Sequence, residues 1–432
     1  MNGLNHFKET ASRAGARFNG SEARIGKLRW LLLVVALVVQ FILVNPASAQ
    51  QWTVTQAPDE SWTAIASSAD GSTLVAVADN QPGYIYISMD SGTTWTNANA
   101  PSQSWTGVAC SADGTQIVAV GNNYPGAIYT STDAGSTWVN DNAPSAEWTG
   151  VASSADGSNL VAVADDYPDG SIYVSDDAGG TWNTTDAPFS SWASVAASSD
   201  GSNWVAVGNN FPAGPVYIST NAGFNWRATL APSEEWESVA SSADGTILAA
   251  VGNNYPEGPV CVSTNAGATW PLVGATADNY FAIACSADGK RLVAASQEIG
   301  GESGVIYLST NTGHSWQNMN APQAVWTSVT SSGDGRKLAA VVNGGGIYTW
   351  QSASPPPAPS IASIALAGNN VVLTASNGAA GVTYVLMSST NLAQGGWVPV
   401  ATNALGASGS FSITAGAVNP DVSRQFFRIR AQ

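Results

Sequence analysis

Charged residues and cysteines are both scarce in this sequence, and each scarcity excludes a class of protein. Only 10% of the 432 residues are charged and 44% are hydrophobic, so we expect a folded chain despite its 44 glycines. The three cysteines are an odd number and cannot form a complete disulfide framework. Cys110 and Cys285 occupy a repeated position where other copies have Ser or Ala, so we interpret them as small core residues and expect no metal site.

Basic residues are few as well, since 14 Lys and Arg stand against 30 Asp and Glu and the formal net charge is −16. Six of the 14 and only two of the 30 lie within residues 1–49, so the rest of the chain is still more acidic. Phosphate backbones and anionic lipid surfaces repel such a chain, and we therefore expect no nucleic-acid partner.

Long hydrophobic runs are missing except near the N-terminus. A positively charged region ends at Arg29, an apolar run covers Trp30–Val44, and Ala47–Ala49 provides small residues at a cleavage position. This order is typical of a secretory signal peptide over residues 1–49. An uncleaved anchor is the alternative, although about 15 apolar residues are short for a bilayer. We expect a mature protein without a membrane span, secreted, periplasmic or on the surface of a bacterium.

What the sequence does contain is a repeat of between 43 and 46 residues. An aromatic residue marks each copy, at Trp62, Trp105, Trp148, Trp192, Trp236, Tyr280 and Trp326. Each copy has four short apolar runs separated by turn residues, such as WTAIAS, TLVAVA, YIYIS and TWTNA in the first. This pattern predicts four short strands per copy.

Asp-Gly separates the first two strands in all seven copies, beginning at Asp70, Asp113, Asp156, Asp200, Asp244, Asp288 and Asp334. Asp-Gly favours a tight hairpin because glycine adopts the required backbone angles at little cost. These aspartates could alternatively serve as acids in catalysis. We interpret them as turn residues.

The two ends of the repeat region complement each other. The seventh copy stops after its third strand, within residues 346–352, and the missing fourth strand is found at Gln51–Pro58, where QWTVTQAP aligns with TWTNANAP. An N-terminal strand that completes the last copy would close a ring and leave only short sheet edges. The sequence therefore predicts an all-β chain in which residues 50–352 form a seven-bladed β-propeller closed by the N-terminal strand.

The turn between the third and fourth strands carries a second motif in six copies, for example SMDSGTTW, STDAGSTW and STNTGHSW. It resembles the Asp-box, or bacterial neuraminidase repeat, of sialidase-like and sortilin-like propellers, and the repeats are also similar to those of photosystem II assembly-factor propellers. The resemblance implies a structural role, in which a polar residue caps the turn and an aromatic residue packs between strands. These are Asp90, Asp133, Asp177, Asn221, Asn265 and Asn311, with Trp95, Trp138, Trp182, Trp226, Trp270 and Trp316.

Sialidase activity is not expected, although the Asp-box is found in sialidases. The resemblance implies that a sialidase would hold its substrate carboxylate with three convergent arginines. The repeat region contains only Arg227, Arg291 and Arg336. Two of these lie in Asp-Gly hairpins and one follows a box tryptophan, away from the place that a clamp requires.

The connections of the repeat sort onto two faces. The Asp-Gly hairpins and boxes share one face, here called the lower face. The loops between second and third strands and the connections between copies share the other, the upper face, where ligands bind in similar propellers. The upper face repeats an Asn-Asn-aromatic-Pro loop, which makes Asn123, Tyr124, Asn210, Phe211, Asn254, Tyr255 and the variant residue Tyr167 candidates for ligand binding.

Aromatic rings beside amides suit sugars, because the ring faces stack and the polar groups bond hydroxyls. The alternative is a Pro-stabilised turn whose aromatic packs on a neighbouring sheet. A pair of upper-face carboxylates could also hydrolyse glycosides. The acids available are Asp79, Asp165, Asp166, Asp169, Glu257, Glu298, Glu302, Glu147, Glu234, Glu235 and Asp278.

Beyond the repeats the composition changes. Residues 353–359 are a Pro-rich linker. Residues 360–432 contain runs for five or six short strands, which predict a small β-sandwich. The pattern SSTNL, then a Trp, then FFRIR resembles a C-terminal module of large secreted bacterial proteins.

The functional expectation is a non-catalytic binding or scaffold propeller. We assign no catalytic residue, metal or cofactor, and expect a monomer whose upper-face loops contact a glycan or an extracellular or envelope protein. A glycoside hydrolase and an extracytoplasmic assembly factor remain as alternatives.

Overall fold

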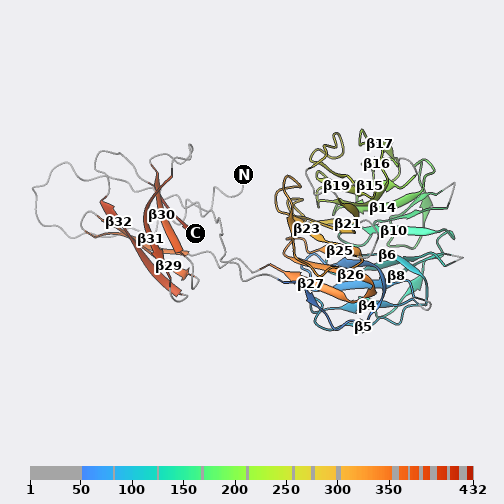
Figure 1. The fold of residues 1–432 in the computed structure, drawn as a ribbon, viewed down its shortest axis with the longest axis horizontal. Coiled ribbons are helices and arrows are strands. Elements are labelled where there is room, and N and C mark those ends of the chain that lie inside the picture. Colours follow the sequence, from blue (N-terminus) through green and yellow to red (C-terminus); the bar gives the residue numbers. More distant parts are fainter. Residues whose placement is uncertain are drawn as a thin grey trace, which may run out of the picture. The chain divides into compact units, whose positions relative to one another are not determined.

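The computed structural model describes residues 51–80, 83–123, 126–166, 170–210, 214–254, 258–273, 278–297, 303–352, 360–367, 370–378, 383–389, 397–405, 409–417 and 426–431. The predicted signal peptide and the Pro-rich linker lie outside these residues. The chain divides into two compact units, one within Ser48–Ala353 and the other within Ser354–Gln432. Every regular element among the described residues is a strand, which confirms the all-β prediction (Figure 1).

The first unit is a succession of small antiparallel groups of strands in chain order, which we number as sheets 1 to 7; β2 pairs with both β3 and β26, so sheets 1 and 7 are joined in one eight-stranded sheet. Sheet 1 contains β2 (Glu60–Ser67), β3 (Leu74–Ala78), β4 (Ile85–Ser88) and β5 (Thr96–Asn97), and sheet 2 contains β6 (Trp105–Cys110), β7 (Ile117–Gly121), β8 (Ala127–Ser131) and β9 (Val139–Asn140). Sheet 3 contains β10 (Trp148–Ser153), β11 (Leu160–Ala164), β12 (Ile172–Ser175) and β13 (Asn183–Thr184), and sheet 4 contains β14 (Trp192–Ala197), β15 (Trp204–Gly208), β16 (Val216–Ser219) and β17 (Arg227–Ala228). Sheet 5 contains β18 (Trp236–Ser241), β19 (Leu248–Gly252) and β20 (Val260–Ser263); sheet 6 contains β21 (Asn279–Cys285), β22 (Leu292–Gln297), β23 (Ile306–Ser309) and β24 (Gln317–Asn318); and sheet 7 contains β25 (Trp326–Ser331), β26 (Lys337–Gly345), β27 (Ile347–Gln351) and β1 (Thr53–Val54).

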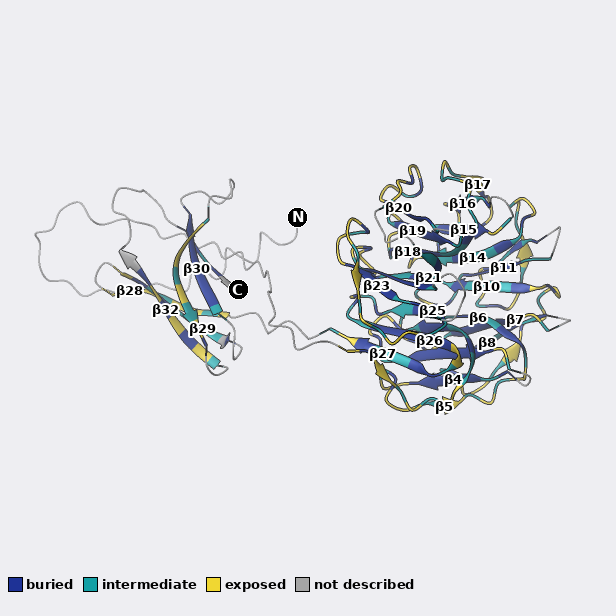
Figure 2. Cartoon of the chain, viewed as in Figure 1, coloured by how far each residue is buried: buried dark blue, intermediate teal, exposed yellow. Residues whose placement is uncertain are grey.

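The second strands form the core of these sheets. Strands such as β7, β11 and β19 are buried along their whole length, as the dark blue in Figure 2 shows. Their near-continuous apolar sequences follow from this, because both faces pack against neighbouring sheets. The fourth strands are only two residues long and exposed. Each sheet is therefore covered by its neighbours on both sides and open at its outer edge.

Sheet 5 departs from the predicted four strands. Its fourth run is reduced to an isolated bridge between Cys261 and Leu272. Pro271 explains the difference, because proline has no backbone N–H to donate to the ladder. The Pro271 carbonyl still accepts from the Val262 N–H at 3.2 Å, so the chain follows the usual path.

The Asp-Gly hairpins are linked to one another by backbone hydrogen bonds. In each case an N–H near the start of one hairpin donates to the carbonyl at the same position of the next. The bonds run from Ala69 to Ala112 (2.8 Å), Ala112 to Ala155 (2.7 Å), Ala155 to Ser199 (2.8 Å), Ser199 to Ala243 (2.8 Å), Ala243 to Ala287 (2.9 Å), Ala287 to Gly333 (2.7 Å) and Gly333 to Ala69 (2.7 Å). The series returns to the residue at which it began.

Sheet 7 is built from both ends of the unit. Strand β1 pairs antiparallel with β27, with Thr53 opposite Thr349 and Val54 opposite Tyr348. Figure 1 shows the orange β26 and β27 beside the blue strands of sheet 1, and β26 also pairs with the start of β2.

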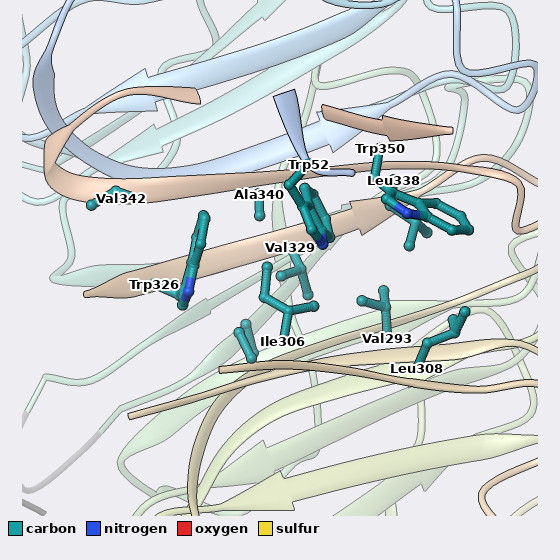
Figure 3. Close-up of a cluster of buried hydrophobic side chains, with 12 residues drawn as sticks. Trp52, Val293, Ile306, Leu308, Trp326, Val329, Leu338, Ala340, Val342 and Trp350 are labelled. Carbon is teal, nitrogen blue, oxygen red and sulfur yellow. The ribbon is translucent and has the colours of Figure 1, made fainter. Parts of the chain in front are cut away.

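Trp52 fastens this N-terminal segment to the core. Its side chain is 8% exposed, and its ring centroid lies 6.2 Å from that of Trp326. Figure 3 shows the ring within a cluster that includes Trp350, Val329 and Ile306, residues from sheets 6 and 7.

The C-terminal unit contains two three-stranded sheets, in the order β28 (Ser360–Ala367), β29 (Asn370–Gly378), β32 (Gly409–Ala417) and β31 (Val398–Ala404), β30 (Thr383–Ser389), β33 (Phe426–Ala431). Alternate residues of β29 and β32 meet those of β30 and β33 in one hydrophobic cluster. Its centre includes Tyr384 stacked on Phe411 at 4.5 Å. The Arg428 guanidinium lies 4.4 Å from the centre of the Trp397 ring, so this charge contacts its own unit through a cation–π interaction.

No helix among the residues that the structure describes has the length and apolar character needed to cross a membrane.

We expect Trp52→Ala to lower the free energy of unfolding by about 3–5 kcal/mol, because it leaves a large cavity in a packed cluster. Val54→Ala is the matched control two residues further along the same segment, where the side chain is 55% exposed and the loss should stay within about 0.5 kcal/mol. Urea unfolding followed by tryptophan fluorescence measures both. Equal stabilities for the two variants would contradict the packing of this segment.

Candidate functional site

The polar side chains of the boxes form hydrogen bonds within their own turns. In the first copy Asp90 Oδ1 accepts the Thr94 N–H at 2.8 Å and Oδ2 accepts the Thr94 hydroxyl at 2.7 Å. The Ser88 hydroxyl donates to Asp90 Oδ1 and accepts the Gly92 N–H, each at 2.8 Å. These bonds hold Ser91 in the left-handed region, at φ 59°. The hydrogen bonds from Thr94 hold the pKa of Asp90 below its usual range, so this carboxylate stays ionised.

The same geometry recurs in the other boxes. Asp133 and Asp177 accept from Thr137 and Thr181. Where Asn replaces Asp, its Oδ1 still accepts the N–H four residues on, at 2.9 Å for Asn221, Asn265 and Asn311, and its Nδ2 donates to the side chain there. An amide therefore satisfies the turn as a carboxylate does.

The box tryptophans lie against the sheets. Trp226 and Trp270 are buried, whereas Trp95, Trp138, Trp182 and Trp316 are partly buried. The indole N–H of Trp95, Trp138, Trp226 and Trp270 donates to the carbonyl of the box glycine. The box tryptophans therefore serve the packing and the turns of their own sheets.

Two of the upper-face asparagines tie their loops to the neighbouring connection. Asn210 Oδ1 accepts the Ser191 N–H at 2.9 Å. Asn254 Oδ1 accepts the Glu235 N–H at 2.9 Å, and its Nδ2 donates to Glu234 Oε2 at 2.7 Å. Asn123 lies at the end of a described segment and is partly buried. The four aromatics proposed with them, Tyr124, Tyr167, Phe211 and Tyr255, lie outside the described residues.

Several upper-face acids have similar structural partners. Asp166 Oδ1 accepts the Glu147 N–H at 2.8 Å. Asp278 accepts the Tyr307 hydroxyl at 2.8 Å. Asp169, Glu257, Glu298 and Glu302 lie outside the described residues.

A regular hydrogen bond joins the first strands of neighbouring sheets at their upper ends. In four sheets a threonine follows the repeat aromatic, and its hydroxyl donates to the carbonyl of the aromatic in the next sheet. The bonds are Thr63 to Trp105 (2.8 Å), Thr106 to Trp148 (2.7 Å), Thr149 to Trp192 (2.6 Å) and Thr327 to Trp62 (2.8 Å).

Three adjacent sheets break this regularity. Ala193, Glu237 and Phe281 replace the threonine in sheets 4, 5 and 6, and all three side chains are partly exposed. Alanine and phenylalanine have no hydroxyl to donate. The carbonyl of Trp326 instead accepts from Gln297 Nε2 at 3.3 Å.

Glu237 is the titratable group of this region. Asn209 Nδ2 donates to its Oε1 at 3.2 Å, and the side chain of Asn253 also hydrogen-bonds it. Burial raises the pKa of Glu237 to about 7; the Asn253 bond lowers it and the nearby charge of Glu235 raises it further. The carboxyl group therefore titrates closer to neutral pH than an ordinary glutamate does, and it can accept a proton or pair with a cation. We name Ala193, Glu237, Phe281, Asn209 and Asn253 the upper cluster.

The sequence analysis missed Glu237. The signal was present in the repeat, because WESVAS has an acid where WTAIAS has a threonine. Its amide partners lie 28 residues before it and in the following loop, so their proximity depends on the packing of sheets 4 and 5.

The residues described here contain no group of three or more His, Cys, Asp or Glu that could hold a metal ion. The three cysteines are free, and burial raises the pKa of each thiol to about 12. Such thiols are poor nucleophiles and poor ligands at neutral pH.

One buried carboxyl group lies away from the upper face. Asp141 is 8% exposed between sheet 2 and the box turn of sheet 3, at a position occupied by Thr55, Thr185 and Thr229 in other copies. The Thr130 hydroxyl donates to its Oδ1 at 2.7 Å. Burial raises the pKa of Asp141 to about 7.

We expect Asp133→Asn to change the free energy of unfolding by less than about 0.5 kcal/mol, because the amide keeps the turn acceptor. Asp133→Ala should lower it by about 1–2 kcal/mol, since the Thr137 N–H loses its partner. Chemical denaturation of the two variants measures the difference. An equal loss in both would show that the charge, not the turn, matters.

Asp141→Asn should stabilise the protein at pH 8 and leave it nearly unchanged at pH 4. The folded pKa is raised, so the folded state holds a proton that the unfolded state releases above about pH 4, and stability from this group falls as the pH rises toward 7. The expected gain at pH 8 is about 2–4 kcal/mol. Urea midpoints across this range measure it, with the exposed Asp176→Asn as control. A gain that does not grow with pH would contradict the burial of this charge.

The fold is shared with solved structures, although no family model and no curated protein sequence matches the chain. Hydrazine synthase of Kuenenia stuttgartiensis aligns with a TM-score of 0.57 and 15% identity, over 69% of this chain and 97% of that one. The structure of YCF48 bound to a D1 peptide aligns with a TM-score of 0.54 and 14% identity, over 73% of this chain and 100% of that one. Both are β-propellers, and at these identities they establish the fold alone: the first unit of this chain is a β-propeller.

Proposed function

We propose that residues 50–352 form a seven-bladed propeller, closed by the N-terminal strand and exported by the signal peptide, that binds a segment of another protein on its upper face without catalysis. Closure is supported by the hairpin series that returns to Ala69 and by the Thr327 bond to Trp62. The pairing of β1 with β27 supports the same arrangement. Export rests on the order of residues in 1–49.

The observation that favours binding at the upper cluster is the break in the repeat at three adjacent sheets. Four threonines serve the structure at the equivalent positions, and their hydroxyls are used between sheets. Ala193, Glu237 and Phe281 have no hydroxyl for that bond, and they place a small residue, an acid and an aromatic residue at equivalent positions of three adjacent sheets. Groups of this kind suit an Arg or Lys side chain, because the carboxylate pairs with the cation and the ring offers its face.

A protein partner is favoured over a glycan for two reasons. The chain carries a net charge of −16, which attracts basic segments over a distance. A propeller of similar fold, YCF48, has been solved bound to a peptide. Peptide capture outside the cytoplasm would also suit an assembly factor, and co-purification with a membrane complex would support that role.

Selection from a phage-displayed random peptide library with the mature protein tests this function. We expect enrichment of Arg- or Lys-containing sequences whose binding tightens between pH 6 and pH 8, as Glu237 ionises. Glu237→Gln should weaken binding at pH 8 about tenfold and remove this pH dependence. Glu147→Gln, at an exposed upper-face acid, is the control and should bind as the wild type does. A library without enriched sequences, or binding indifferent to Glu237→Gln, would contradict the proposal.

Glycoside hydrolysis is the second candidate, because a carboxyl group with a pKa near 7 suits a general acid. The mature protein would then release new reducing ends from a polysaccharide panel, and Glu237→Gln would abolish the release. Peptide binding without release of new reducing ends would support the binding function and exclude hydrolysis of these polysaccharides.

A further inference from the structure

A cavity of about 590 Å³ lies on the lower face between sheet 7 and sheet 1, at the place where the two ends of the repeat region meet. Its lining includes Gln51, Ser91, Thr93, Lys337, Thr349 and Gln351. It is separate from the upper cluster, which lies at the opposite ends of the strands.

Two equivalent places between other sheets are nearly closed. Between sheets 2 and 3 the space is about 10 Å³ and is lined by Gln116, Thr130 and Ala178, among others. Between sheets 4 and 5 it is also about 10 Å³. The repeat itself therefore does not produce the cavity.

The chain ends explain the difference. Gln351 and Gln51 align with Thr132 and Thr137 of sheet 2, which stand on either side of the box turn at residues 133–136. Sheet 7 takes its third and fourth strands from opposite ends of the unit, so it has no turn at this place. The cavity occupies the side of sheet 7 from which the turn is missing.

The lining is polar and electrically balanced. Lys337 Nζ donates to Ser91 Oγ at 3.1 Å, and an ammonium group has two further donors. The pKa of Asp70 is lowered by hydrogen bonds within its own hairpin and also by the Lys337 charge. Asp90 is the acid of the lining, with both carboxylate oxygens held by Thr94 in its own turn. A free anion would meet this carboxylate and a free cation would meet the ammonium group, so neither is favoured. Threonine and serine hydroxyls and glutamine amides, which both donate and accept, make up much of the remainder.

We propose that this cavity, the seam pocket, binds a neutral saccharide of a few sugar units. Sugars present closely spaced hydroxyls that both donate and accept, as this lining does. The volume lies within the range of about 300–1,000 Å³ found for small-molecule sites. The site is independent of the peptide function proposed for the upper face.

Thr93→Phe is the sharpest variant, because position 93 lines the seam pocket and the box tolerates aromatic residues there. Phe224 and His314 occupy the same position in the boxes of sheets 4 and 6. Ala268→Phe makes the equivalent change in sheet 5 and leaves the seam pocket untouched. Lys337→Gln restores the residue type of Gln116 and removes the ammonium donor.

Isothermal titration of the mature protein with cello-, chito-, xylo- and maltohexaose tests the proposal. We expect at least one of these to bind the wild type and Ala268→Phe equally. Binding to Thr93→Phe should be at least tenfold weaker, and binding to Lys337→Gln several-fold weaker. If the thermal unfolding midpoints of both Phe variants equal that of the wild type, the fold is kept.

The proposal is overturned if none of the four sugars binds, or if Thr93→Phe binds as tightly as Ala268→Phe. Peptides selected on the upper face should bind Thr93→Phe normally, and the sugar should bind Glu237→Gln normally. Failure of one site therefore leaves the other site measurable.

Discussion

The structure depends on the packing of each small sheet against both of its neighbours. A strand such as β11 is buried on both faces, and full burial of one Val or Leu side chain is worth about 1.5–3 kcal/mol. One sheet alone would expose this apolar surface on two sides. The hydrogen bonds between hairpins at the lower face and between first strands at the upper face add a directional link at each junction. Each sheet is therefore held in place by its neighbours, and the junction between sheets 7 and 1 has the same two links, from Gly333 to Ala69 and from Thr327 to Trp62.

Much of this arrangement could be predicted from the sequence because local signals agreed with one another. Asp-Gly pairs marked the hairpins, and Gly71 and its counterparts do adopt positive φ values, 67° at Gly71. Continuous apolar runs marked strands that are covered on both faces. The reduced fourth strand of sheet 5 was not predicted. Four strands were assigned to every copy from the repeat, although Pro271 interrupts the fourth run in this one. The propeller fold follows from these local features.

The candidate sites were harder to predict, since each depends on residues that the fold brings together. Asn210 and Asn254 looked like ligand-binding groups, whereas their side-chain oxygens accept backbone N–H groups from the connection nearby. Glu237 looked like an ordinary strand residue, yet amides from two loops surround it. The seam pocket has no motif at all, because it results from a turn that is missing.

Both candidate sites arise where the repeat is interrupted, and this follows from the way a repeated fold uses its polar groups. In a regular copy such as sheet 1, the hydroxyl of Thr63 and the carboxylate of Asp90 each have a structural partner, so little remains to bind a ligand. A group becomes available only if a substitution removes the partner or if the chain ends. Glu237 is an example of the first case, and the seam pocket is an example of the second. The two sites therefore have independent origins.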